Sequence, residues 1–257
     1  MKKRNEKMVV ISILSGKGGV GKTTITSNIA TSLANIFKRK VIVLDTNVTS
    51  SHIKLHFGMY EEMKKNLKDI IRDESTLKGA TYSDEITGVD IVPSPESLKS
   101  LDLEKLKDLA SSLAESKYDF VIIDSAPGFR ENTENVIKAS DKVVIVVNPF
   151  LPDLSDAMKT LDVVRKNKKE VVFVVNRVKG KKYELGEKEI KSMLDAKKII
   201  IIPEDEKIPE SISRGVPVTV FAKTSKSAIA LKKLTAYLIG EKYRPSIADR
   251  IKWFFGF

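Results

Sequence analysis

The chain has 257 residues, of which 42% are hydrophobic, and it carries a formal net charge of +11. A chain of this length and composition can build one substantial α/β core, and nothing in it requires a second domain of that kind. It contains no cysteine, which excludes disulfides and thiolate-bound zinc or iron–sulfur centres, and it has no run of about 18 apolar residues that would span a membrane.

The first predicted strand covers residues 8–14 and follows a short basic segment, residues 1–7. This apolar run is shorter than the hydrophobic region of a secretory signal, and no small-residue cleavage site follows it. We therefore expect a cytoplasmic protein.

A glycine-rich loop follows that strand directly and leads into a helical segment over residues 25–34. Its spacing, Gly16-x4-Gly21-Lys22-Thr23, is that of a Walker A phosphate-binding loop. In such a loop the glycines turn backbone amides toward phosphate oxygens, Lys22 supplies positive charge and Thr23 binds Mg²⁺. The predicted nucleotide-binding residues of the loop are Gly16, Lys17, Gly18, Gly19, Val20, Gly21, Lys22, Thr23 and Thr24.

Beyond the loop, β-branched apolar runs alternate with helical stretches. Continuous runs of this kind are typical of strands buried on both faces, and their alternation with helices predicts a doubly wound, mostly parallel α/β sheet with helices on both faces. The predicted strands cover residues 41–44, 89–92, 120–123, 143–147, 171–175 and 199–202, and the predicted helices cover 103–114, 155–166, 188–194 and 227–239. Residues 60–88 show the weakest pattern, and no role is predicted for them.

Ligands of such sheets bind beyond the carboxyl ends of the strands. Asp124 ends a predicted strand in the way a Walker B aspartate does, where it would hold Mg²⁺ through a water. Gly128 lies four residues further on, where a switch loop offers its amide to the terminal phosphate. The predicted magnesium-binding residues are Thr23, Asp45 and Asp124.

The glycine-rich loop carries a second lysine, Lys17, directly after its first glycine. In this feature the chain resembles the deviant Walker A ATPases, the family of the MinD and ParA proteins, and residues 202–205 and 213–218 look particularly like MinD proteins. The resemblance implies ATP and Mg²⁺ as ligands and an ATP-dependent homodimer in which Lys17 crosses to the phosphates of the partner subunit. It also implies nucleotide contacts from Asn176, Arg177, Pro203 and Asp205.

Position 47 departs from the family's pattern. Relatives usually carry Asp-x-Asp after the second strand, and the second Asp orients the attacking water, whereas this chain reads Asp45-Thr46-Asn47. Asparagine holds a water without accepting its proton, and losing a general base typically costs about 10² to 10⁴ in rate. Because phosphoryl transfer needs little help from a base, we expect slow ATP hydrolysis, with a nucleotide-gated scaffold of negligible turnover as the alternative. The predicted catalytic residues are Lys17, Lys22, Asp45 and Asn47.

The C-terminal segment, residues 244–257, has the pattern of an amphipathic helix and resembles the membrane-targeting helix of MinD. We therefore divide the chain into one P-loop ATPase domain, residues 1–243, and a membrane-targeting tail that binds anionic lipid on the inner face of the cell membrane. The alternative is a tail that docks onto its own protein. The predicted lipid-facing residues are Ile247, Ile251, Trp253, Phe254, Phe255 and Phe257.

Runs of lysine and arginine stand between predicted helix ends and strand starts at residues 38–40, 165–169 and 197–198. They complement helix dipoles and keep the protein soluble, or they form a basic surface for DNA or anionic lipid. Our leading hypothesis is a MinD-like ATPase that positions division or surface machinery through a regulator or cargo protein. The runner-up is a ParA-like partition ATPase that binds DNA without sequence preference.

Overall fold

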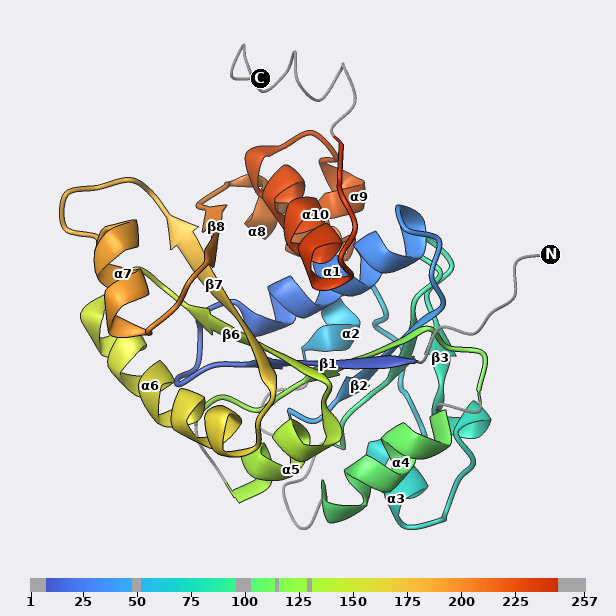
Figure 1. Ribbon diagram of the computed structural model, residues 1–257. Helices are drawn as coiled ribbons and strands as arrows, with labels where there is room; N and C mark the ends of the chain where they lie inside the picture. Colours follow the sequence, from blue (N-terminus) through green and yellow to red (C-terminus); the bar gives the residue numbers. More distant parts are fainter. Residues whose placement is uncertain (1–7, 48–51, 96–102, 114–115, 129–130, 245–257) are drawn as a thin grey trace.

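The structure is a computed structural model that describes residues 8–47, 52–95, 103–113, 116–128 and 131–244 (Figure 1). Within these residues, the strands form an eight-stranded sheet of order β3-β4-β2-β5-β1-β6-β7-β8. Neighbouring strands of this sheet are parallel, except that β3 pairs antiparallel with β4. The predicted doubly wound, mostly parallel α/β fold is therefore confirmed.

Each apolar run that predicted a strand is a strand in the structure. The strands are β1 (Val9–Leu14), β2 (Val41–Asp45), β3 (Tyr82–Ser83), β4 (Asp90–Val92), β5 (Phe120–Asp124), β6 (Lys142–Val147), β7 (Glu170–Val178) and β8 (Ile199–Pro203). Strand β3 was not predicted, because two residues are too short a run for a hydrophobic period to show.

The helices include every predicted one and several short ones. The α-helices are α1 (Lys22–Asn35), α2 (Ile53–His56), α3 (Leu67–Ile71), α4 (Leu106–Leu113), α5 (Glu131–Ala139), α6 (Leu151–Lys166), α7 (Glu187–Met193), α8 (Lys207–Ser213), α9 (Val218–Phe221) and α10 (Lys226–Leu238), with 3₁₀ turns η1 (Lys78–Ala80) and η2 (Leu103–Lys105). Helix α6 starts one turn before its predicted first residue, because Pro152 is favourable in the first turn of a helix.

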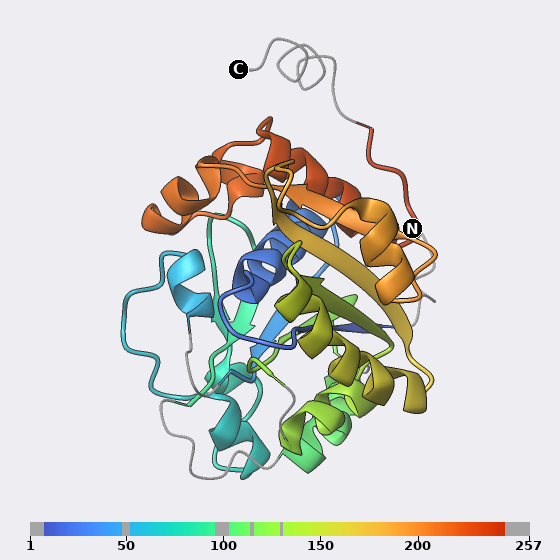
Figure 2. The same ribbon diagram turned by 90° about the vertical axis from the view of Figure 1, so that its left-hand side faces the viewer.

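Helices cover both faces of the sheet and divide the core into two layers (Figures 1 and 2). Strand β1 shows the division, since Val10 and Leu14 pack with α4, α5, α6 and α7, whereas Ile11 and Ile13 pack with α1, α2, α9 and α10. Burying one such side chain stabilises the fold by about 1.5 to 3 kcal/mol. The two layers hold the central strands, and hence the loops at their carboxyl ends, in a fixed arrangement.

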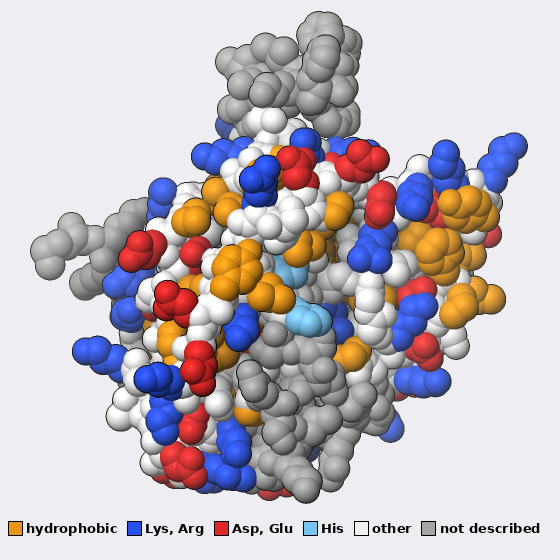
Figure 3. Space-filling model, turned by 180° about the vertical axis from the view of Figure 1, so that it is seen from behind, with side chains coloured by type: hydrophobic (Ala, Val, Ile, Leu, Met, Phe, Trp, Pro, Cys, Tyr) orange, Lys and Arg blue, Asp and Glu red, His pale blue; other side chains and the backbone are white. Residues whose placement is uncertain are grey.

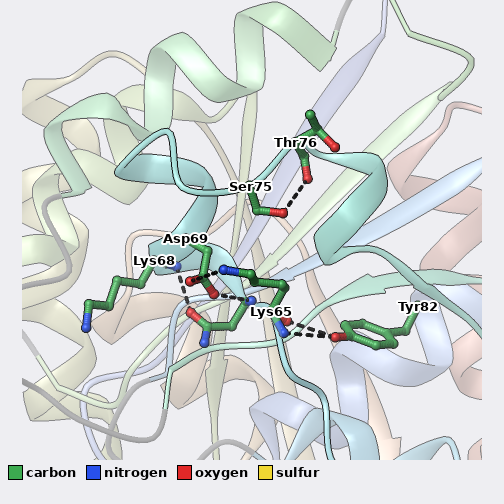
Figure 4. Close-up of polar contacts among 7 residues, drawn as sticks. Lys65, Lys68, Asp69, Ser75, Thr76 and Tyr82 are labelled. Atoms are coloured by element: carbon green, nitrogen blue, oxygen red, sulfur yellow. Dashed lines mark hydrogen bonds and ion pairs between the residues drawn. The ribbon is translucent and has the colours of Figure 1, made fainter.

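The segment without a predicted role, residues 60–88, is held by local hydrogen bonds (Figure 4). Helix α3 begins with a capping box, in which the Asn66 side chain accepts from the amide of Lys68 at 3.0 Å and the Asp69 carboxylate accepts from the amide of Asn66 at 2.8 Å. The Tyr82 hydroxyl accepts from the amide of Lys65 at 3.0 Å and joins β3 to this cap. Side-chain capping, rather than hydrophobic periodicity, orders this edge of the sheet.

His56, at the end of α2, is buried in the layer formed with α1, where its Nδ1 lies 3.3 Å from the Ser27 hydroxyl. Burial, with a smaller contribution from His52, lowers the pKa of His56 to about 4. In the unfolded chain this pKa is about 6.5, so the unfolded state takes up the proton first as the pH falls. Stability contributed by neutral His56 is therefore present above pH 6.5 and is lost toward pH 4.

We predict that the free energy of unfolding falls by about 2 kcal/mol between pH 7 and pH 5 through His56 alone. Urea unfolding at both pH values measures this loss. The variant His56→Asn, which keeps a polar partner for Ser27 but does not titrate, should lose less, and His52→Asn should keep most of the wild-type slope. Equal pH slopes in the wild type and His56→Asn would contradict the assignment.

Among the described residues, no helix combines the length and the apolarity needed to cross a membrane. The residues predicted to face lipid, Ile247, Ile251, Trp253, Phe254, Phe255 and Phe257, lie outside the described residues.

Candidate nucleotide-binding site

The glycine-rich loop connects β1 to α1 at the carboxyl edge of the sheet, with β5 on one side of β1 and β6 on the other. Gly21 has a φ of 95°, and a Cβ at this position would lie 2.4 Å from Nδ2 of Asn176. A Cβ on Gly16 would lie 2.4 Å from the backbone carbonyl carbon of Asp156 in α6. Only glycine fits at these two positions, and the loop is thereby packed between α6 and the end of β7.

Lys22, the first residue of α1, is buried, and its Nζ lies 3.0 Å from the hydroxyl of Ser15. Burial lowers the pKa of this ammonium, and the nearby Asp124 carboxylate opposes that effect. A buried ammonium with so little compensating charge favours a bound anion. Lys22 therefore lies where the sequence predicts phosphate binding.

Asp124, at the end of β5, is held by the first turn of α1. Its Oδ2 accepts from the Thr23 hydroxyl at 2.8 Å and its Oδ1 accepts from the Thr26 hydroxyl at 2.9 Å. Asp45 ends β2 and is paired in register with Asp124, so the structure brings all three predicted magnesium-binding residues to one edge. Burial raises the pKa of Asp124, and the Thr23 hydrogen bond and the Lys22 charge oppose the rise.

These residues fit a magnesium ion that is shared with a nucleotide. The described residues contain no group of three or more His, Cys, Asp or Glu side chains that would hold a metal by themselves. Mg²⁺ does not need such a group, because it takes oxygen ligands and usually keeps several waters and substrate phosphates. Thr23 and Asp124 supply a hydroxyl and a carboxylate of this kind. When bound, Mg²⁺ would neutralise charge that develops on the phosphates.

The predicted switch residue, Gly128, lies against the start of the glycine-rich loop. Its amide donates to the carbonyl oxygen of Ser15 at 3.1 Å, and its φ is 80°. Pro127 lies beside Gly18, since a Cβ on that glycine would be 3.7 Å from the proline ring. The segment that follows Asp124 therefore contacts the glycine-rich loop.

The residues after β7 and β8 that the resemblance implies as nucleotide contacts fall into two groups. Asn176 is buried beside the loop, where its Nδ2 donates to the carbonyl oxygen of Val20 at 2.8 Å, while its Oδ1 has no hydrogen-bond partner among the described residues. Arg177 follows it, exposed and with a φ of 57°. Asp205, two residues beyond Pro203, accepts from the amide of Lys207 at 3.0 Å and from the hydroxyl of Ser227 at 2.7 Å. Its carboxylate therefore joins the starts of α8 and α10, a structural role that the sequence did not reveal.

Asn47 is buried beside Asp45. Its amide donates to Oδ1 of Asp45 at 2.8 Å, and its carbonyl oxygen accepts from the Ser94 hydroxyl at 3.3 Å. These contacts fix the backbone of the Asp45-Thr46-Asn47 turn at the edge that carries Asp124. The backbone of position 47 is therefore fixed at the same edge of the sheet as Asp124.

We predict that Asn47→Asp raises ATP turnover by about tenfold, because it restores a group that accepts a proton from water. The gain is smaller than the full contribution of a general base if Asp45 already acts on the same water. Steady-state phosphate release measures the rate, and Asn47→Ala is the control that removes the water-binding amide and should not gain. Unchanged or slower release from Asn47→Asp would contradict this reading of position 47.

The sequence analysis missed Asp153. Its side chain is 2% exposed, and its Oδ2 lies 3.0 Å from Nζ of Lys17, whose side chain is 43% exposed. The other oxygen, Oδ1, is buried, and within the part of the chain that the structure describes it has no hydrogen-bond partner. No sequence motif includes Asp153. Its position beyond the carboxyl end of β6, at the edge where ligands of such sheets bind, is the signal that could have identified it.

Comparisons with known proteins agree with this geometry. A sequence model described as an AAA domain matches residues 8–174. An ATP-binding protein of Methanocaldococcus jannaschii is 32% identical over 246 residues, which cover 94% of this chain and 92% of that protein.

Two solved structures share the fold. The septum site-determining protein MinD of Pyrococcus horikoshii, complexed with Mg-ADP, has a TM-score of 0.82 and 29% identity, covering 90% of this chain and 96% of that one. In the MinC:MinD complex of Aquifex aeolicus the matching chain has a TM-score of 0.84 and 28% identity, with 93% and 98% covered. Together with the two lysines of the loop, these matches show that the chain belongs to the AAA-domain family of P-loop proteins, among the MinD and ParA ATPases.

Proposed function

We propose that this protein is a MinD-like ATPase. ATP binding drives two copies together, the dimer attaches reversibly to a membrane surface and positions division or surface machinery there, and slow hydrolysis of ATP reverses the attachment. The observation that carries the proposal is the placement of the second lysine. Lys17 is partly exposed at the rim of the phosphate loop, whereas Lys22 is buried beneath it.

Because of this difference, the two lysines can contact different phosphates. The ammonium of Lys22 lies inside the loop at 3.0 Å from Ser15, where it serves the nucleotide of its own subunit. Lys17 is held at the side of the loop by Asp153 and has to leave that carboxylate to contact any phosphate. A positive charge supplied in trans stabilises charge on a transferring phosphoryl group, as an arginine finger does. ATP would then favour the dimer because only the dimer makes these contacts.

Membrane attachment rests on the sequence of residues 244–257, which carry a row of large apolar side chains flanked by Arg250 and Lys252. One such segment binds an anionic membrane weakly and reversibly. Two segments on one dimer make the second insertion intramolecular, which can raise the overall avidity by about 10² to 10⁴. Nucleotide-dependent dimerisation would in this way control attachment.

A ParA-like function with DNA as the partner is the second candidate. The basic runs at residues 38–40, 165–169 and 197–198 all lie between a helix and the strand that follows it, at the amino edge of the sheet. Two of these side chains form ion pairs, since Arg39 pairs with Glu241 at 2.8 Å and Arg165 with Asp195 at 3.0 Å. Exposed pairs of this kind are weak, so the charges stay available to a polyanion. The apolar side chains of residues 244–257 favour the membrane as the partner.

Co-sedimentation with anionic liposomes and with plasmid DNA, each with ATP and with ADP, tests the proposal. The full chain should sediment with liposomes in ATP and much less in ADP. Deletion of residues 246–257, or Ile251→Glu with Phe254→Glu, should release it while ATP binding stays intact. Undiminished liposome binding by the truncated protein, or ATP-dependent binding to DNA alone, would overturn the membrane-binding role.

A further inference from the structure

A groove opens at the β3 edge of the sheet, away from the phosphate loop. It has a volume of about 780 Å³ and is lined by residues 57–63, which follow α2, by residues 81–86, which include β3, and by Arg214 and Gly215. Figure 3 shows the face that carries α2, where hydrophobic side chains and acidic side chains lie close to the histidines. The groove is large enough for several bulky side chains of a bound segment.

The walls of this groove are held in place. On one wall, the Tyr82 hydroxyl is bonded to the amide and the carbonyl oxygen of Lys65 at 3.0 and 3.2 Å, as Figure 4 shows. Elsewhere in the lining, Gly58 and Gly215 pack so tightly that a Cβ on Gly215 would lie 2.4 Å from Cα of Gly58. The groove is therefore preformed and does not have to open before a segment binds.

The lining of the groove combines apolar side chains, several acidic side chains and one basic side chain, Arg214. Tyr60 and Ile86 are 66% and 58% exposed, a high exposure for large apolar residues. Glu61, Glu62 and Glu85 are also exposed along the groove, although the protein as a whole has a net charge of +11. Such a surface fits a segment that is both aromatic and basic.

The C-terminal segment of this chain has that composition. Residues 245–257 contain Arg250 and Lys252 among isoleucine, phenylalanine and tryptophan side chains, and no acidic residue except Asp249. We propose that this groove binds the chain's own residues 245–257 when no membrane is present. The inference rests on the proposed role of these residues in membrane binding, and it adds the site that holds them off the membrane.

A series of contacts connects the end of the described chain to the segment that leads to the groove. Tyr243 lies under the ammonium of Lys232, 5.7 Å from Nζ to the ring centroid, and the same ammonium donates to the carbonyl oxygen of Lys223. Residue 223 follows α9, which begins three residues after Gly215 in the lining of the groove. Thirteen extended residues span up to about 40 Å, and a helix of the same length spans about 20 Å, which sets the range within which residues 245–257 can bind.

Groove and membrane would then compete for the same apolar side chains. A segment that is docked for about nine-tenths of the time lowers the apparent affinity of the monomer for lipid about tenfold. The dimer overcomes this competition because it presents two segments to one surface. The groove therefore increases the difference in membrane affinity between the ATP-bound dimer and the monomer.

Trp253 is the chain's sole tryptophan and reports on this segment directly. Its emission and its quenching by acrylamide should be measured in the ADP-loaded full chain without lipid, with the peptide of residues 244–257 as the free reference. We expect blue-shifted, weakly quenched emission from the full chain and peptide-like emission from two variants. These are Glu61→Lys with Glu62→Lys, which reverses the charge, and Tyr60→Ser with Ile86→Ser, which removes the apolar contacts.

The matched control is Asp108→Lys with Asp162→Lys, which makes the same charge change at exposed positions of α4 and α6. The control should keep the wild-type emission. The second experiment measures binding to anionic liposomes in ADP. Glu61→Lys with Glu62→Lys should bind about tenfold more tightly than the charge-matched control, and Tyr60→Ser with Ile86→Ser should bind about tenfold more tightly than the wild type.

Peptide-like quenching of Trp253 in the wild type, or equal emission from groove and control variants, would overturn docking in this groove. Failure of every protein to bind liposomes would overturn the membrane-binding role instead. Protected Trp253 that the groove variants release would support docking in either case.

Discussion

Replacing Lys22 by alanine is expected to remove the stabilisation of this protein by ATP. The Lys22 ammonium is buried in the phosphate loop, and a charge-assisted hydrogen bond of this kind contributes about 1.5 to 3 kcal/mol. Its loss lowers nucleotide affinity by about 10 to 10². Because a ligand stabilises the fold according to its concentration relative to its Kd, the rise of Tm with ATP should disappear at concentrations near the wild-type Kd.

The nucleotide-free Lys22→Ala protein should unfold near the wild-type temperature. Burial disfavours the charged form of Lys22, so its removal relieves a cost in the absence of phosphate, and this gain offsets the lost attraction between Lys22 and Asp124. Lys159→Ala is the control, since Lys159 is exposed and pairs with Asp156 at 3.3 Å on the surface of α6. A wild-type shift of Tm by ATP in Lys22→Ala would show that the loop does not bind the phosphates through this residue.

Replacing Lys17 by alanine is expected to prevent ATP-dependent dimerisation while leaving ATP binding by the monomer largely intact. A symmetric dimer makes the Lys17 contact twice, so the loss amounts to about 3 to 6 kcal/mol, or about 10² to 10⁴ in the dimerisation constant. Sedimentation with a non-hydrolysable ATP analogue measures it. A persistent dimer in Lys17→Ala would contradict a contact between subunits.

Asp153→Asn tests the same contact from the other side. In the structure Asp153 holds Lys17 at 3.0 Å, and a partly exposed ion pair contributes up to about 1 kcal/mol. Because a symmetric dimer breaks this pair twice, its removal should favour the dimer by up to about thirtyfold. Lys17→Ala leaves the buried carboxylate of Asp153 without its cation. Lys17→Arg keeps a positive charge beside Asp153 and is the control for that effect. Weaker dimerisation in Asp153→Asn would show that Asp153 supports the bound conformation of Lys17 and does not restrain it.

The fold was largely predictable from the sequence because its strands are buried on both faces. Runs such as Val143–Val147 have no polar face, and such runs alternate with helices in only a few architectures. The phosphate loop was predictable because its glycines and its lysine must stand at fixed spacings. Lys22, Thr23 and Asp124 therefore lie together as expected, with the hydroxyl of Thr23 2.8 Å from the carboxylate.

The sequence did not predict contacts between distant segments that no motif describes. The pairing of Lys17 with Asp153 depends on how α6 packs against the loop, which is decided by Gly16 and Ala157 and not by any pattern around Asp153. The edge around β3 escaped prediction for a different reason. Its order comes from single side chains such as Asn66 and Tyr82, and these give no periodic signal.

The tight contact at Gly16 leaves no room for a side chain between the glycine-rich loop and α6. A Cβ there would lie 2.4 Å from the Asp156 carbonyl carbon and 2.6 Å from the Ala157 amide, so any larger residue would push the loop away from the helix. Because Lys17 lies on the loop and Asp153 on the helix, such a displacement would also separate the ion pair that they form at 3.0 Å. Gly16 therefore sets the spacing on which that ion pair depends.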